Sequence, residues 1–109
     1  MGDRLNREQT MESSNAAREF KDEFGDNTIA KVEAYIDGES VIDDNIQVTI
    51  SDYDGWVNVN IMWEDVGLKK KVYNKLGLNG YYSSGFCKMT FDGETLEIET
   101  DNGVVKITG

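Results

Sequence analysis

Residues 46–63 have the sequence IQVTISDYDGWVNVNIMW, and this stretch decides the fold because it predicts a β-hairpin. Apolar and polar side chains alternate on both sides of Asp54-Gly55, a period of two that is typical of a strand with one buried face. Asp-Gly favours a two-residue type I′ turn, which needs positive φ at both central residues. Counting outward from that turn pairs apolar residues with one another: Ile50 with Val59, Val48 with Ile61, and Ile46 with Trp63.

The C-terminal part of the chain predicts a second set of hairpins. Asp92-Gly93 and Asn102-Gly103 divide residues 86–108 into three alternating segments, which indicates a three-stranded meander. Asn79-Gly80 gives a poorer hairpin, so a bulge or a longer loop is expected near Gly85. Two-residue turns in the meander predict these pairs: Met89 with Leu96, Cys87 with Ile98, Lys88 with Glu97, Ile98 with Ile107, and Glu99 with Lys106.

The first 25 residues follow a helical period instead. Ala16, Ala17, Phe20 and Phe24 recur at three- and four-residue spacing, and capping residues on either side predict a helix over 14–24. Residues 1–13 offer little apolar surface and are expected to form a flexible or frayed arm.

The 109 residues therefore predict an α+β protein with a single domain over 14–109. One N-terminal helix packs on a curled antiparallel sheet of about seven or eight strands built from consecutive hairpins.

Composition excludes several chemistries. The chain has no His and one Cys, Cys87, which excludes His-dependent catalysis, an intramolecular disulfide and a Cys-rich zinc site. We therefore expect no enzyme activity, no catalytic residue, no metal and no cofactor, with Cys87 as an inert core thiol. No apolar run reaches the roughly 20 residues of a membrane-spanning helix, and no apolar signal region is present, so a cytoplasmic protein without a membrane partner is expected.

The negative charge is concentrated in one part of the chain. Lys and Arg total 11 against 21 Asp and Glu, a net charge of -10, yet no base lies between Lys31 and Lys69. Eight acids of that interval are predicted to bind a partner: Asp37, Glu39, Asp43, Asp44, Asp52, Asp54, Glu64 and Asp65. If turns alternate between the two ends of the sheet, the first two share an end with Asp52 and Asp54, and the other four share the opposite end.

Two interpretations fit this distribution. Asp is a good turn residue and acids keep a small protein soluble, so the acids need no partner. Alternatively, they form a surface complementary to a basic protein, which the missing Lys favours because solubility alone prefers interspersed signs. Direct nucleic-acid binding is not expected, since its affinity comes from Lys and Arg.

A second, smaller candidate surface is aromatic. The basic run 69–71 is expected to be a solvated strand edge, or else a contact for phosphate or an acidic partner. Tyr73, Tyr81 and Tyr82 lie near it in the sequence and are predicted as secondary partner-binding residues. Tyr81 and Tyr82 face opposite sides of a strand, so one of them should be exposed.

The favoured function is a small inhibitory binding protein that occupies a basic, nucleic-acid-binding surface of a protein partner. A phage-encoded nucleic-acid mimic that inhibits a CRISPR effector (an anti-CRISPR) or a restriction nuclease is one such protein. Two alternatives stay open: an immunity protein that neutralises a basic toxin nuclease, and a structural or virion-associated β module with no inhibitory role.

Overall fold

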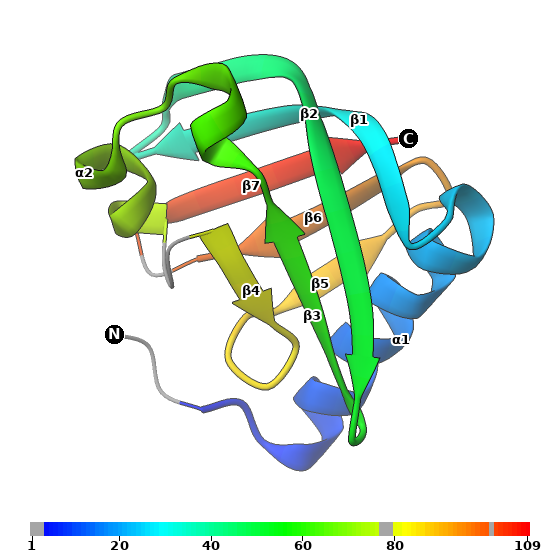
Figure 1. Cartoon of the computed structure of the whole chain (residues 1–109). Helices are drawn as coiled ribbons and strands as arrows, with labels where there is room; N and C mark the ends of the chain where they lie inside the picture. Colours follow the sequence, from blue (N-terminus) through cyan, green and yellow to red (C-terminus); the bar gives the residue numbers. More distant parts are fainter. Residues whose placement is uncertain (1–3, 77–79, 101) are drawn as a thin grey trace.

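The structure, a computed structural model, describes residues 4–76, 80–100 and 102–109, and the side chains of Tyr53 and Tyr73 lie outside that description. It contains one N-terminal helix against a curled antiparallel sheet, which confirms the predicted α+β class (Figure 1). The seven strands of this sheet have the order β4-β3-β2-β1-β7-β6-β5. The elements are α1 (Arg7–Phe24), β1 (Asn27–Ile36), β2 (Glu39–Tyr53), β3 (Trp56–Ile61), η1 (Trp63–Val66), α2 (Lys70–Tyr73), η2 (Asn74–Leu76), β4 (Tyr81–Ser83), β5 (Met89–Phe91), β6 (Thr95–Glu99) and β7 (Gly103–Thr108).

The strands are not all joined by consecutive hairpins, as the sequence suggested. Between β3 and β4, residues 62–76 and 80 are described and hold three short helical elements, and after β4 the chain crosses from one edge of the sheet to the other and begins β5. The expected irregularity at Asn79-Gly80 falls partly on residues 77–79, outside the described part, and Gly85 lies in the crossing connection. Because the sheet is curled, α1 contacts β3 and β2 on one side and β5 and β6 on the other.

Both Asp-Gly turns of the N-terminal half have the expected conformation. The φ angles are 53° and 82° at Asp37-Gly38 and 49° and 84° at Asp54-Gly55, as a type I′ turn requires. The predicted pairs Ile50 with Val59 and Val48 with Ile61 are confirmed. The predicted pair Ile46 with Trp63 is wrong, because β3 ends at Ile61, Trp63 begins η1, and Ile46 pairs with Ala30 of β1.

Strands β5, β6 and β7 form the predicted meander, but the β5–β6 register differs from the prediction. The Asp92 carboxylate accepts hydrogen bonds from the backbone N–H groups of Glu94 and Thr95, at 2.9 Å and 2.8 Å. Asp92 therefore precedes the turn, and Gly93 takes a central position with φ 103°. As a result the predicted pairs Met89 with Leu96, Cys87 with Ile98, and Lys88 with Glu97 are wrong. The pairs are Met89 with Ile98, Thr90 with Glu97, and Phe91 with Leu96.

The β6–β7 register also differs from the prediction, but it is shifted in the opposite direction. Gly103 belongs to β7 instead of the turn, since Thr100 N–H donates to its carbonyl and a Cβ there would collide with the Tyr35 carbonyl of β1. The predicted pairs Ile98 with Ile107 and Glu99 with Lys106 are therefore wrong. Ile98 faces Val105 and Glu97 faces Lys106, whose Nζ lies 3.8 Å from Glu97 Oε1.

Helix α1 begins at Arg7, so the predicted start near residue 14 is wrong. Asn6 caps the helix: its side chain accepts from Gln9 N–H at 2.8 Å, and the Gln9 side chain accepts from Asn6 N–H at 3.1 Å. The boundary drawn at residue 13 falls inside α1, where Ser13 and Ser14 are buried. Two buried hydroxyls interrupt the apolar pattern, and this is why the periodicity found only the second half of the helix.

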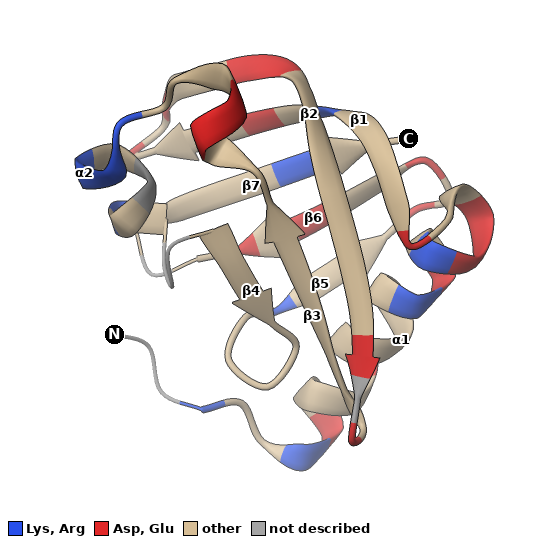
Figure 2. Cartoon of the chain, viewed as in Figure 1, with Lys and Arg blue, Asp and Glu red and all other residues tan. Residues whose placement is uncertain are grey.

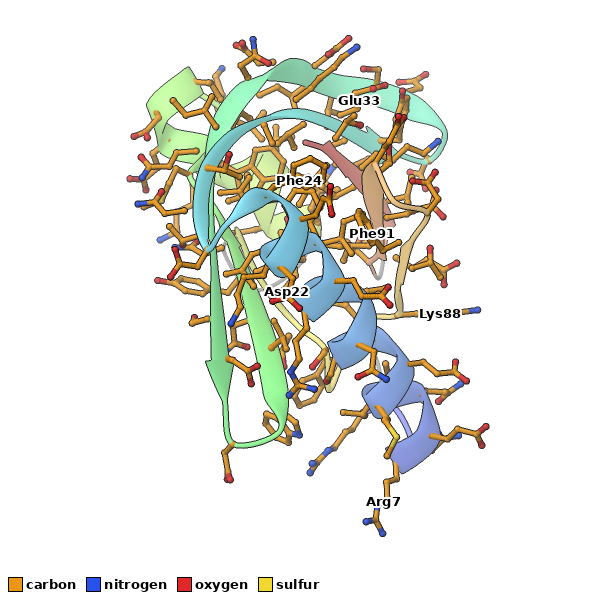
Figure 3. The ribbon with its side chains drawn as sticks, turned by 90° about the vertical axis from the view of Figure 1, so that its right-hand side faces the viewer. Arg7, Asp22, Phe24, Glu33, Lys88 and Phe91 are labelled. Atoms are coloured by element: carbon orange, nitrogen blue, oxygen red, sulfur yellow. The ribbon has the colours of Figure 1, made fainter. Side chains whose placement is uncertain are left out.

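Aromatic packing holds the C-terminal half of α1 on the sheet. Phe20 is fully buried, with its ring centroid 4.9 Å from that of Phe24 and 5.8 Å from that of Phe91. Figure 3 shows Phe24 and Phe91 between the end of α1 and the meander. Burial of Phe20, predicted from its spacing, is confirmed.

Buried serines hold the N-terminal half of α1. Ser84 Oγ accepts from Val57 N–H at 2.9 Å and lies 2.7 Å from Ser14 Oγ. Ser14 donates to the Gly55 carbonyl at 3.3 Å, so Ser84 must donate to Ser14. Each hydroxyl proton thus has an acceptor, and the network joins α1 to the β2–β3 hairpin and to the residue that follows β4.

Candidate protein-binding surface

The predicted acids do not gather at two ends of the sheet as expected. Strand β2 is continuous from Glu39 to Tyr53, with no turn at Asp43-Asp44. Asp37 and Glu39 therefore lie at the opposite end of β2 from Asp52 and Asp54, and that predicted grouping is wrong. The alternation of apolar and polar residues does not reveal that one strand continues through Asp43-Asp44, because a strand that bends can pass through such a polar pair without a turn.

The other expected grouping is found. The chain leaves β3 toward β2, with Met62 N–H donating to the Gln47 carbonyl at 3.1 Å, and η1 contacts β2. Figure 2 shows acidic segments on the arch of β2 and on η1 at the same end of the molecule, and a separate one at the C-terminal end of β2 beside α1. We call the exposed acids of the β1–β2 hairpin and η1 the acidic rim: Asp37, Glu39, Asp43, Asp44, Glu64 and Asp65.

One base offsets part of this rim. Glu33 pairs with Asp43 across β1 and β2, and Lys31 Nζ lies 3.8 Å from Glu33 Oε1 and 4.0 Å from Asp43 Oδ1. Glu33 also accepts a 2.7 Å hydrogen bond from the Tyr35 hydroxyl, and this bond raises the pKa of Tyr35. The negative charge of the rim is therefore partly neutralised at Asp43.

The acids of η1 line a groove with an exposed tyrosine. The groove has a volume of about 330 Å³ and lies where β3, η1 and β4 meet. Tyr81 is 54% exposed, so its ring is open to a partner, as one of the two tyrosines was predicted to be. Two carboxylates beside an aromatic ring suit a Lys or Arg side chain, through ion pairing and cation–π contact. Its lining residues are Asn60, Ile61, Met62, Trp63, Glu64, Asp65 and Tyr81.

Tyr82 is a core residue, so its assignment to a binding surface is wrong. It is fully buried, pairs with Val59, and accepts a 3.2 Å hydrogen bond from Trp63 Nε1. Burial raises the pKa of its hydroxyl, which stays protonated at neutral pH. The predicted Tyr73 ends α2, and its side chain lies outside the described part.

Two further assignments change. The basic run is not a strand edge, because Lys70 and Lys71 begin the short helix α2 (Figure 2). Cys87 is half-buried in the connection before β5, and Met89 occupies the place opposite Ile98 that was predicted for it.

The acidic end of β2 has its own partner on α1. Arg18 donates to both carboxylate oxygens of Asp52, at 2.7 Å and 3.1 Å. This pairing lowers the pKa of Asp52 and raises the pKa of Arg18. Asp52 therefore joins β2 to α1 through this ion pair, while Asp54 is exposed at the tip of the β2–β3 hairpin.

No cluster of three or more His, Cys, Asp or Glu suited to a metal ion occurs within residues 4–76, 80–100 and 102–109. Within those same ranges no helix is long and apolar enough to cross a membrane. Comparison with protein-family models, curated proteins and solved structures found no match to this chain.

Asn60 and Met62 line the groove but were missed from the sequence. Their strand period marks Asn60 only as an outward residue, like every second position of β3. What distinguishes Asn60 and Met62 is their place next to η1, which begins at Trp63 and contacts β2, and only the fold reveals that contact.

Proposed function

We propose that this protein acts by occupancy: its acidic rim docks on a basic surface of a protein partner that otherwise binds nucleic acid. The observation that carries the proposal is the union of Glu64, Asp65 and exposed Tyr81 in one groove, next to the acids of β2. Binding hot spots are enriched in Tyr, so an exposed Tyr beside two acids supports a contact surface better than scattered acids do.

Electrostatics supports the choice of a basic partner. Like charges held together destabilise a fold, and the rim gathers six exposed acids on the β1–β2 hairpin and η1. A complementary partner relieves that repulsion and is attracted at long range, which speeds association at low salt. Nucleic-acid-binding surfaces are the common basic surfaces with this chemistry.

The test uses two charge-matched variants as baits. In the first, Asp43, Asp44, Glu64 and Asp65 are changed to Asn or Gln; in the control, Glu12, Glu19, Asp22 and Glu23 of α1 are changed in the same way. All eight acids are exposed, so both variants should fold. A specific partner should be retained by the wild type and by the α1 variant, lost from the rim variant, and displaced by added nucleic acid.

The on-rate with that partner should fall steeply as salt rises. Equal retention by both variants, or a partner that nucleic acid does not displace, would contradict the proposal. Changing Tyr81 to Ala should weaken the complex without changing the salt dependence of the on-rate, since the ring carries no charge.

A further inference from the structure

All three Arg residues of this strongly acidic chain lie around a single groove. The groove has a volume of about 550 Å³ and lies between the N-terminal half of α1 and the tip of the β2–β3 hairpin. We call it the arginine groove; Arg4, Arg7 and Arg18 line it, and Asp54 is the one acid among its lining residues. Its local charge is therefore opposite to that of the acidic rim.

Two of the three guanidinium groups are available to a ligand. Arg18 is held by Asp52, whereas the guanidinium carbon of Arg4 lies 4.6 Å from the centroid of the Trp56 ring, a contact that uses no acceptor oxygen. Arg7 extends from the end of α1 away from the body of the protein (Figure 3). Among the described residues, neither Arg4 nor Arg7 has a carboxylate within ion-pair distance.

Apolar side chains occupy the space between these cations. Met11 is 56% exposed, and Trp56 is half-buried with its ring packed edge-on against Phe86, which is 39% exposed. Met11 and Phe86 are two of the four large hydrophobic side chains exposed on the described surface. An exposed apolar patch bordered by charges is typical of a site that another molecule covers.

The groove is elongated along the helix. Arg7, Met11, Ser14 and Arg18 follow one another at helical spacing and line one face of α1. Eleven residues at a rise of about 1.5 Å give this face a length of roughly 16 Å. An extended peptide covers that length with about five residues at roughly 3.3 Å each.

We propose that the arginine groove binds an extended acidic peptide segment of a partner protein, with carboxylates on Arg4 and Arg7 and an apolar side chain between Met11 and Trp56. A long polyanion is a poorer ligand, because the net charge of -10 repels it beyond the groove. A short segment avoids this, since charges farther than about 8 Å are screened at physiological salt. The inference is independent of the acidic rim, which takes a partner of the opposite charge.

The two Trp residues provide a local readout. Trp56 lines the groove, whereas Trp63 is 2% exposed in the core, so their indole N–H signals in a ¹H–¹⁵N NMR spectrum separate local binding from a general effect. The probe is a capped six-residue peptide with Glu at each end and Leu and Phe between. Its counterpart carries Gln in place of Glu.

The acidic peptide should shift the Trp56 indole signal in a saturable way and leave the Trp63 signal in place. The Gln peptide should bind about tenfold more weakly, because it loses the charge-assisted hydrogen bonds. The double variant Arg4→Gln, Arg7→Gln should bind the acidic peptide more weakly than the wild type by a similar factor. The matched variant Lys75→Gln, Lys88→Gln removes two exposed cations outside the groove and should bind like the wild type; Lys88 points away from the protein on another side (Figure 3).

Three outcomes would overturn the assignment. Equal affinity for the two peptides would show that their carboxylates do not contribute to binding. This comparison uses the wild-type protein, so it does not depend on the folding of a variant. A shift of the Trp56 signal by inorganic phosphate as large as that by the acidic peptide would make the groove a small-anion site. A Trp56 shift that appears without peptide as the protein is concentrated would make a second copy of the chain the occupant.

Discussion

Changing Ser84 to Ala tests the network that seats α1 on the sheet. Ser84 is fully buried, and its Oγ accepts the Val57 N–H at 2.9 Å while its proton goes to Ser14. Alanine fits the space but leaves the Val57 N–H buried without its acceptor. An unsatisfied buried group costs about 1–3 kcal/mol, and the lost hydroxyl pair adds about 1 kcal/mol.

The expected loss in the free energy of unfolding is therefore about 2–4 kcal/mol, a large share of the roughly 5–15 kcal/mol of a typical domain. Changing Ser14 to Ala should cost less, because Ser84 still accepts from Val57 and the Ser14 bond to Gly55 is long, at 3.3 Å. The double variant should cost less than the sum of the two, since the hydroxyls bond to each other.

Urea unfolding followed by circular dichroism measures these differences at a constant m-value. A cost of Ser84→Ala below about 0.5 kcal/mol, the range of neutral surface changes, would refute the assigned network. Strict additivity with Ser14→Ala would refute the bond between the two hydroxyls even if each single change is destabilising.

Three further perturbations follow from the structure. Phe20→Ala should lower the free energy of unfolding by about 3–5 kcal/mol because the ring is fully buried. Phe24→Ala should lower the free energy of unfolding by less, because Phe24 is half-buried, and urea unfolding measures both values. The pKa of Asp52 is lowered in the folded protein, so its ion pair stabilises the fold above the ordinary Asp pKa of about 3.9, and this stabilisation is lost as pH falls through the pKa of the folded state. The difference in free energy of unfolding between wild type and Asp52→Asn should therefore become smaller in acid. A difference that is constant with pH would contradict this. Moderate salt should raise the melting temperature by screening the acidic rim, and more so in Lys31→Gln than in Lys88→Gln, because only Lys31 lies between Glu33 and Asp43.

The strand pattern and the Asp-Gly turns could be predicted because both are local. Asp54-Gly55 sets the register of its hairpin through backbone geometry alone, and the two apolar pairs nearest the middle of that hairpin follow. Asp92-Gly93 has the same dipeptide but a different turn, because the Asp92 side chain binds the two N–H groups that follow Gly93. The dipeptide alone does not reveal whether the Asp side chain enters the turn or caps it.

The candidate sites could be predicted only in part. Acidic residues can be counted in the sequence, and the exposure of one residue of Tyr81-Tyr82 follows from strand alternation. The arginine groove was missed because Arg4, Arg7 and Arg18 face the hairpin tip at Asp54–Trp56, far away in the sequence. Their clustering in the first 25 residues was the one available signal.

The sequence by itself determined the α+β class, the strand-rich segments, the tight turns and the uneven distribution of charge, since these depend on residues a few positions apart. Only the tertiary structure decided the course of β2 through the sheet, the crossing from β4 to β5, and the contact of α1 with both sides of the curled sheet. These features place the two surfaces of opposite charge on one curled sheet and its helix. They arise from burial of side chains distant in the sequence, as when Ser14 meets Ser84 and Phe20 meets Phe91, and no local pattern contains that information.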